Sequence, residues 1–194
     1  MVDVAGAETE EGGLDAALAA ARTGDEAGFR VLWRALQPRL LRYLYLHAGE
    51  AADDIAAETW LHIVRDLGRF RGDADEFRAW LFTVARHRAI DAARARRARP
   101  AIPLGDVTAL AHGEAAVSAE AAVLEWTATR DALALVATLP AEQAEMVALR
   151  VVAGLDVATV ARLVGKSPGA VRVGVHRGLR ALAQKSPSRA GVER

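Results

Sequence analysis

The sequence predicts an all-α protein made of two small helical domains joined by a flexible linker. Ala, Leu, Arg and Glu, which occur often in helices, dominate the 194 residues, whereas aromatic residues make up only 5% of the chain. The alternation of β-branched and aromatic residues that is typical of strands is absent from the sequence. Between residues 100 and 117, two prolines and two glycines interrupt the helical pattern, so we expect the linker there.

The predicted helices follow the apolar periodicity along the chain. In the first half they cover residues 14–22, 25–47, 51–67 and 75–98, and Pro38 is expected to bend the second of them. In the second half they cover residues 118–138, 141–153, 157–164 and 168–184. We therefore expect a disordered tail at 1–13, one domain at 14–99, the linker at 100–117, a second domain at 118–185 and a C-terminal tail at 186–194.

The composition excludes several classes of protein. The chain has no cysteine, which removes disulfides, thiolate metal sites and cysteine nucleophiles and suits a reducing cytosol. The acidic N-terminus lacks the apolar centre of a signal peptide, and no apolar run approaches the roughly 18 residues of a membrane span. We therefore expect a cytoplasmic protein that does not insert into a membrane.

The net charge of zero, from 25 basic and 25 acidic residues, hides a strong segregation of charge. Lys166 and Lys185 are the only lysines, so every other basic residue is an arginine, whose planar fork suits phosphate and guanine. Residues 166–185 include five cations and no acid. Basic residues also crowd the helix expected to end near residue 98: Arg86, His87, Arg88, Arg94, Arg97 and Arg99.

The segment FRAWLFTVARHRAIDAARARRAR at 77–99 predicts a helix that lies on nucleic acid. Trp80, Leu81, Val84, Ala85 and Ile90 recur at offsets that share a buried stripe, and most of the basic residues fall outside it. A helix of this length spans roughly 35 Å. Its arginines can follow a phosphate backbone while an aromatic side chain meets unstacked bases, which favours melted DNA over intact duplex. The aromatic candidates are Phe77, Trp80 and Phe82, although a tryptophan at the position of Trp80 is more often a core residue than a stacking platform.

The second half of the chain ends in a predicted helix-turn-helix. Asp156 caps a short helix, Gly165 supplies the turn, and Ser167 caps the next helix, with Pro168 at its first position. The pattern predicts a buried face of Val171, Val175, Gly178, Leu179 and Leu182. It leaves these residues for DNA: Lys166, Ser167, Gly169, Arg172, Val173, His176, Arg177 and Arg180. Any pair of antiparallel helices can show such a pattern, and the absence of acids is what favours DNA.

These motifs resemble those of the extracytoplasmic-function (ECF) subfamily of bacterial RNA polymerase sigma factors. GFRVLWRALQPRLLRYL, ADDIAAETWLHIVRDLGRF and the 77–99 helix are similar to sigma region two, which docks on the polymerase and melts the minus-ten promoter segment. LPAEQAEMVALRVVAGLDVATVARLVGKSPGAVRVGVHRGLRALA is similar to region four, which reads the minus-thirty-five element. The resemblance covers about 27–100 and 125–184.

The resemblance implies roles for individual residues. It makes a polymerase-binding surface of Asp53, Asp54, Glu58, Trp60, Leu61, His62 and Arg65, although Ile55, Leu61 or Val64 can instead belong to the core and the acids can simply favour a helix N-terminus. The turn RFRGDADE, with Arg71 and Asp73, resembles the loop that captures a flipped promoter base, and it also fits a plain turn and helix cap. Val173 and Gly174 depart from the family pattern, and Gly174 is expected to lose a phosphate contact.

The predicted function is that of a sigma factor, which binds core RNA polymerase and promoter DNA and directs DNA melting and transcription initiation. The resemblance also implies an anti-sigma factor as a partner. No catalytic activity, cofactor or metal is expected, because the five histidines show no metal-site spacing and Gly165, Lys166 and Ser167 lack the earlier glycine of a phosphate-binding loop. The alternative is a homodimeric helix-turn-helix regulator that binds duplex DNA without polymerase.

Overall fold

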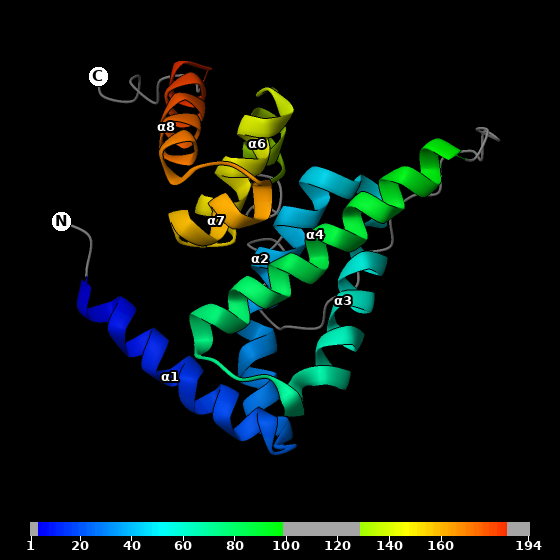
Figure 1. Ribbon diagram of the computed structural model, residues 1–194, viewed down its shortest axis with the longest axis vertical. Coiled ribbons are helices and arrows are strands. Elements are labelled where there is room, and N and C mark those ends of the chain that lie inside the picture. The colour runs from blue at the N-terminus through cyan, green and yellow to red at the C-terminus, as the bar shows by residue number, and fades with distance from the viewer. Residues whose placement is uncertain (1–3, 99–128, 186–194) are drawn as a thin grey trace, which may run out of the picture.

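A computed structural model describes residues 4–98 and 129–185 (Figure 1). The described residues are helical with short connections and contain no strand, which confirms the predicted fold class. The linker at 100–117, the tail at 186–194 and Arg99 lie outside the described residues. The first half consists of α1 (Val4–Arg22), α2 (Glu26–Ala48), η1 (Gly49–Ala51), α3 (Ala52–Asp66), η2 (Leu67–Arg69) and α4 (Ala74–Ala98).

The helices of the first half begin and end close to the predicted residues, with one exception. Helix α1 begins at Val4, within the segment expected to be a disordered tail. Helix α2 runs through Pro38 as one element and is capped by Asp25, whose side chain accepts hydrogen bonds from the backbone of Ala27 and Gly28. Gly28 allows α1 and α2 to cross closely, because a Cβ atom there would lie 2.7 Å from the carbonyl oxygen of Ala17.

The second half contains the predicted helix-turn-helix. Residues 129–137 are helical and are followed by α6 (Ala141–Val147), a π-helical turn η3 (Ala148–Val152), α7 (Val157–Val164) and α8 (Pro168–Lys185). The Asp156 carboxylate caps α7, Gly165 ends it in the left-handed conformation with φ 67°, and the Ser167 hydroxyl accepts a hydrogen bond from Ala170 N. All three predicted turn residues therefore act as the sequence indicated.

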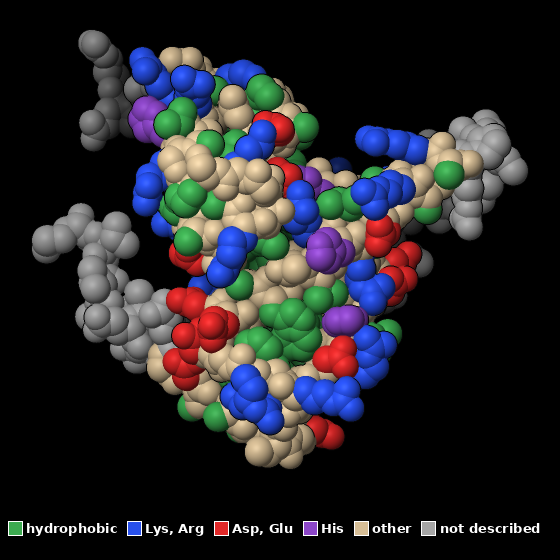
Figure 2. Space-filling view, in the orientation of Figure 1, with side chains coloured by type: hydrophobic (Ala, Val, Ile, Leu, Met, Phe, Trp, Pro, Cys, Tyr) green, Lys and Arg blue, Asp and Glu red, His purple; other side chains and the backbone are tan. Residues whose placement is uncertain are grey.

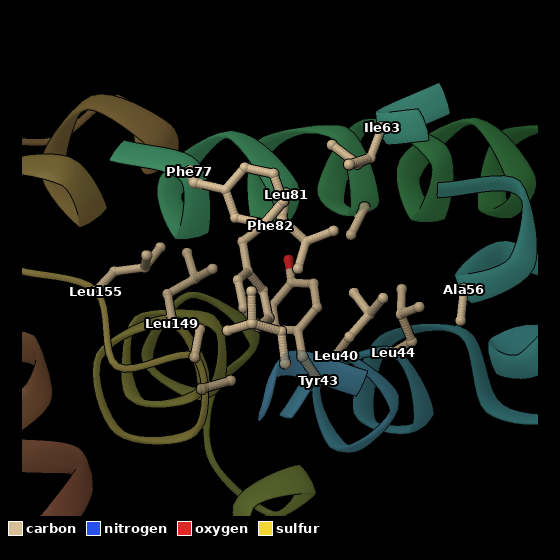
Figure 3. Packing of buried hydrophobic residues seen from close by; sticks show 14 of the residues in the cluster. Leu40, Tyr43, Leu44, Ala56, Ile63, Phe77, Leu81, Phe82, Leu149 and Leu155 are labelled. Atoms are coloured by element: carbon tan, nitrogen blue, oxygen red, sulfur yellow. The ribbon is translucent and has the colours of Figure 1, made fainter. Parts of the chain in front are cut away.

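The two halves are packed against each other through one hydrophobic core. Tyr43 of α2 and Phe82 of α4 belong to the same buried cluster as Leu149 of η3 and Leu155, which precedes α7 (Figure 3). Tyr43 and Phe82 meet edge to face with ring centroids 5.5 Å apart. The sequence predicted two helical domains joined by a linker and left their relative placement open. In the structure η3 of the second half packs against α2, and α8 lies on the far side of α6 and α7 from α2 and α4 (Figure 1).

Candidate nucleic-acid interface and polymerase-binding surface

The buried stripe of α4 follows the predicted helical period, but two aromatic residues lie on it. Leu81 and Ala85 are fully buried, whereas Trp80, Val84 and Ile90 are partly buried. Phe77 and Phe82 are 0% exposed in the core. The prediction that Phe77 or Phe82 meets unstacked bases is therefore wrong, and of the three aromatic candidates Trp80 alone reaches the surface.

Trp80 lies in a group of aromatic rings at the start of α4. Its ring stacks on that of Phe70, with the centroids 5.1 Å apart and the planes 7° from parallel. The His62 ring meets Trp80 edge to face at 6.4 Å. Figure 2 shows hydrophobic side chains gathered on this face of the molecule, between α3 and α4, with basic, acidic and histidine side chains around them. The stacked rings provide an apolar surface of the kind on which a nucleic-acid base can stack.

Several arginines of α4 are already ion-paired. Arg88 donates to Glu58 of α3 at 2.6 Å, Arg94 lies 3.4 Å from Asp91, and Arg86 donates to Glu145 of α6 at 2.7 Å. His87, Arg96 and Arg97 are exposed, and neither arginine forms an ion pair with a described residue. The face is cationic, and part of its charge is neutralised by acids from α3 and α6.

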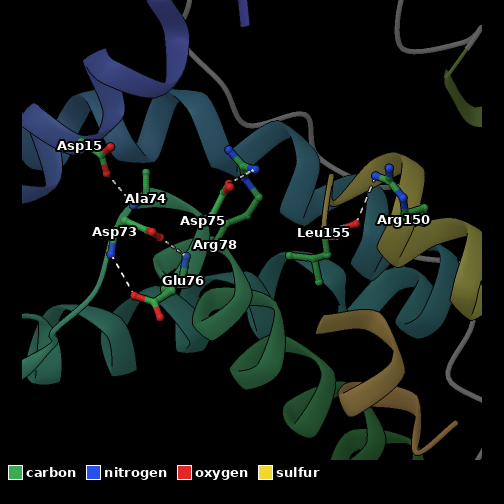
Figure 4. Close-up of polar contacts among 8 residues, drawn as sticks. All are labelled: Asp15, Asp73, Ala74, Asp75, Glu76, Arg78, Arg150 and Leu155. Carbon is green, nitrogen blue, oxygen red and sulfur yellow. Dashed lines mark hydrogen bonds and ion pairs between the residues drawn. The ribbon is translucent and has the colours of Figure 1, made fainter. Parts of the chain in front are cut away.

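The turn before α4 is held by a network of hydrogen bonds (Figure 4). The Asp73 carboxylate accepts from Glu76 N at 2.8 Å and the Glu76 carboxylate accepts from Asp73 N at 3.2 Å, which is a reciprocal capping box. Asp15 of α1 accepts from Ala74 N at 2.7 Å. Arg71 donates to the carbonyl oxygens of Gly68 and Phe70. Asp73 is exposed and serves as a helix cap, and its contact with a DNA base stays a prediction.

The exposed face of α3 combines acids with apolar side chains. Asp53, Asp54, Glu58 and Arg65 are exposed and His62 is partly buried. Leu61 is 71% exposed and Val64 is 53% exposed, so the alternative that places them in the core is wrong, whereas Ile55 is buried as predicted. The predicted surface requires one correction. Trp60 is 7% exposed, because its ring packs against Phe29 and its indole N–H donates to Gln37 of α2 at 2.6 Å.

Helix α8 presents the predicted DNA-facing side chains to solvent. Val173 is 49% exposed, and the Lys166 ammonium nitrogen, also exposed, lies 3.1 Å from a carboxylate oxygen of Glu142 of α6. The other exposed residues of this set are Ser167, Gly169, Arg172, His176, Arg177 and Arg180. On the other face, Val171, Gly174 and Gly178 are buried. Leu179 is 43% exposed, so its predicted place in the core is wrong. Gly174 faces Met146 of α6 and not solvent, so it does not occupy a phosphate-contacting position.

Comparisons with known proteins agree with this geometry. Residues 32–99 match Sigma-70 region 2 and residues 129–182 match Sigma-70 region 4. The ECF RNA polymerase sigma factor SigD of Mycobacterium tuberculosis is 35% identical over 178 residues, which cover 87% of this chain and 82% of that protein. The chain belongs to the ECF RNA polymerase sigma factors. BldN of Streptomyces coelicolor, a member of the same family, is 34% identical over 169 residues, and this chain spans 63% of its length.

Solved structures share the fold of this sigma factor. CnrH, determined in complex with the cytosolic domain of CnrY, superposes with a TM-score of 0.57 at 22% identity, covering 89% of this chain and 96% of CnrH. The sigma factor RpoE of Bartonella quintana, determined with the anti-sigma factor NepR, gives a TM-score of 0.56 at 18% identity, covering 80% and 94% of the two chains. At these identities the likeness shows the fold. Within the described ranges of this sigma factor, no helix is long and apolar enough to cross a membrane.

Two residues near the candidate interfaces were missed by the sequence analysis. Phe70 stacks on Trp80, and its place in the sequence, between the basic residues Arg69 and Arg71 and ten positions before Trp80, gave no periodic signal. Glu145 pairs with Arg86 from the other half of the sigma factor, 59 residues away. No local pattern could have found Glu145, because the contact exists only once the two halves pack together.

Proposed function

We propose that this sigma factor binds core RNA polymerase through the exposed face of α3, reads duplex promoter DNA with α8, and holds the melted strand on α4. The observation that carries the proposal is the presence of two different nucleic-acid surfaces on separate halves of one chain. Helix α8 offers exposed arginines suited to a major groove, whereas α4 offers the stacked Trp80 ring near its start and exposed arginines toward its end. A duplex-binding regulator needs the first surface and has no use for the second.

On α8 the proposed readers of base edges are Arg172, Val173, His176 and Arg177, and Lys166, Ser167 and Arg180 lie toward the phosphates. Arginine pairs bidentately with guanine, and an apolar side chain such as Val173 fits against a thymine methyl group. Gly169 in the first turn lets the DNA backbone approach closely, since it has no side chain. The helix lacks acidic residues throughout its length, so nothing on it repels phosphate.

On α4 the proposed surface holds unpaired bases. Stacking on an aromatic ring contributes about 1–3 kcal/mol per base, which offsets the cost of unstacking. We propose Trp80, on which Phe70 stacks, as the platform, and Arg71, His87, Arg88, Arg94 and Arg97 as the basic residues that contact the phosphates of the strand before and along α4. Asp73 is proposed to contact a captured base with the carboxylate oxygen that the capping box leaves free. The mechanism uses binding energy alone, so we propose no catalytic activity.

The proposed partners are core polymerase, promoter DNA and an anti-sigma factor, which places the protein in the cytoplasm with the transcription machinery. An anti-sigma factor is included because RpoE, which shares this fold, was determined in complex with one. Affinity purification from the native cell is expected to recover polymerase subunits together with an inhibitor protein. Recovery of self-associated chain alone would contradict the proposal.

The decisive experiment is transcription from a genomic promoter library by core polymerase, with and without this protein, beside a gel shift with the protein alone. We expect new start sites that require the protein, permanganate-reactive thymines around those starts, and weak binding of duplex by the free protein. Tight, two-fold-symmetric duplex binding without polymerase, and no new transcripts with it, would overturn the proposal and favour a homodimeric regulator.

A further inference from the structure

A pocket of about 780 Å³ lies where the turn between α1 and α2 meets the end of α3 and η2. These segments come together at one end of the first half (Figure 1). Residues 21–26 form one wall of the pocket, Phe29 and Trp33 of α2 form a second, and Val64, Leu67 and Gly68 form a third. Pockets that bind small organic molecules usually have volumes of about 300–1,000 Å³, so this pocket has the size of a ligand site.

The second and third walls of the pocket are apolar and partly open to solvent. Trp33 is 41% exposed and Val64 is 53% exposed. The half-buried Phe29 ring is held in place by Trp60, which it meets edge to face with the centroids 5.6 Å apart. Within the described ranges, the Trp33 indole has neither a ring contact nor a hydrogen bond. Trp33 therefore offers an aromatic face and an N–H donor to a molecule in the pocket.

The rim of the pocket carries two arginines whose charges are not paired. Arg22 is the last residue of α1 and is half-buried, and Arg30 of α2 is exposed. Neither guanidinium forms an ion pair or a hydrogen bond with any residue that the structure describes. Arginine side chains in such a position can donate to an oxyanion in the mouth of the pocket.

The two acids of the rim are placed differently from the arginines. Both carboxylate oxygens of Asp25 accept hydrogen bonds from backbone N–H groups at the start of α2. Glu26 lies in the first turn of α2, where the helix dipole stabilises a negative charge. The helix N-terminus thus compensates these carboxylates, whereas the two guanidinium groups remain available to an anion.

We propose that this pocket binds a small organic acid with an apolar body. The body lies against Phe29, Trp33 and Val64, and the acidic group accepts hydrogen bonds from Arg22 and Arg30. A neutral apolar molecule leaves the two guanidinium groups unpaired, and an inorganic anion leaves the apolar walls in contact with water, so a ligand with both parts fits best. Trp33, Arg22 and Arg30 belong to neither proposed interface, so the inference does not depend on the proposed function.

Anilinonaphthalene sulfonate is a probe with this chemistry, because it joins an apolar ring system to one sulfonate and its fluorescence rises when it leaves water. We expect the full, free chain to bind one molecule of it saturably at neutral pH. Trp33→Ala, and the double variant Arg22→Gln with Arg30→Gln, should each weaken this binding by about tenfold. Absence of saturable binding would overturn the proposal and would leave the pocket to a segment of a partner protein.

Phenylnaphthylamine, which has the same rings without the sulfonate, separates the apolar contact from the charged one. Trp33→Ala should weaken its binding by about the same factor as that of the sulfonate. The double arginine variant should change its affinity by no more than about twofold, because this probe has no anionic group to pair with a guanidinium. An equal loss of affinity for both probes in the arginine variant would overturn the proposal.

Two matched controls lie on α2 outside the pocket. Arg34→Gln removes a charge from an exposed position one turn after Arg30, and Val31→Ala shortens an apolar side chain that is 49% exposed. Both variants should bind both probes as the parent does. Because the sulfonate also binds loosened folds, circular dichroism and denaturant unfolding of every variant accompany the titrations. If Arg34→Gln weakens binding of the sulfonate as much as the double arginine variant does, the probe responds to the overall charge of α2 and the proposal is overturned.

Discussion

Gly178 of the recognition helix α8 lies directly against Val147 of α6. A Cβ atom at Gly178 would be 2.7 Å from Val147 Cγ2 and 3.3 Å from Leu139 Cδ1, and Val147 is 2% exposed. A Cβ atom at Gly174, one helical turn earlier, would meet the end of the Met146 side chain. The two glycines thus let α8 approach α6 closely, and this contact fixes the orientation of the side chains that we propose to face DNA.

We expect Gly178→Ala to lower the free energy of unfolding by about 1–3 kcal/mol, because Val147 is stiff and buried and cannot give way. Gly174→Ala should lower the free energy of unfolding by a smaller amount, since the flexible Met146 side chain can rotate and alanine has a helix propensity up to about 1 kcal/mol more favourable than that of glycine. Denaturant unfolding of the two variants and the parent measures both values. Equal stability of Gly178→Ala and the parent would show that α6 and α8 pack less tightly than the structure indicates.

Replacing Leu61 with serine should weaken binding to core polymerase by about tenfold or more, because an exposed apolar side chain at the centre of a partner surface contributes strongly when buried. Stability should change by no more than about 0.5 kcal/mol, since Leu61 is 71% exposed in the free chain. Val31→Ser on α2, at a residue that is 49% exposed, is the matched control. If both variants bind polymerase as the parent does, α3 does not form the polymerase-binding surface.

Replacing Arg94 and Arg97 with alanine should weaken promoter complexes formed with polymerase and flatten their salt dependence. Each lost phosphate contact reduces the slope of log K against log salt by up to about 0.9. The double variant Arg30→Ala with Arg34→Ala removes the same charge from exposed positions of α2 and serves as the control. If the slope of log K against log salt is identical to that of the parent, the C-terminal end of α4 does not contact the DNA phosphates.

His47 makes the stability of the folded chain depend on pH. Burial lowers the pKa of His47 below its ordinary value of about 6.5, the nearby Glu145 raises it and Arg86 lowers it, and its Nε2 has no hydrogen-bond partner. Since the folded pKa is the lower one, the unfolded chain takes up the proton first. The contribution of neutral His47 to the free energy of unfolding is therefore fully present above about pH 6.5 and is lost as the pH falls through the pKa of the folded state.

We expect the free energy of unfolding of the parent to fall below pH 6.5 with a contribution from His47 of at most about 1.4 kcal/mol per pH unit. His47→Phe should flatten this part of the profile while it keeps an aromatic ring against Tyr43, whose ring centroid lies 4.5 Å from that of His47. Denaturant unfolding at pH 5.5 and 7.5 compares the two proteins. Parallel profiles for the parent and His47→Phe would contradict the assignment.

Much of the local structure could be predicted from the sequence because it depends on nearest neighbours along the chain. Asp156, Gly165 and Ser167 mark the boundaries of α7 and α8 by capping and by the left-handed turn, which involve atoms within a few residues. The exposed basic face of α8 was predicted for the same reason, since a helical period and the absence of acids are both local properties. The start of α1 was missed, because residues 4–13 lack the apolar period on which the prediction relied.

Helix faces with apolar residues on both sides could not be oriented from the sequence. On α3, Trp60 and Leu61 are adjacent and both apolar, and the sequence analysis placed both on the partner surface. In the structure Trp60 turns inward to Phe29 and Gln37, whereas Leu61 turns to solvent. On α4, Phe77 packs edge to face against Phe70, and Phe82 packs in the same way against Tyr43 in the core. Trp80, on the same helix, is only partly buried.

The sequence by itself determined the helices, their caps, the order of the two DNA-binding motifs and the family, since these are encoded in residue types at short spacing. Only the tertiary structure decided how the halves meet. Arg86 and Glu145 lie 59 residues apart, and Tyr43 and Leu149 share a core across the same boundary. Their contact depends on burying apolar surface from both halves at once, a property of the packed molecule that no local pattern carries.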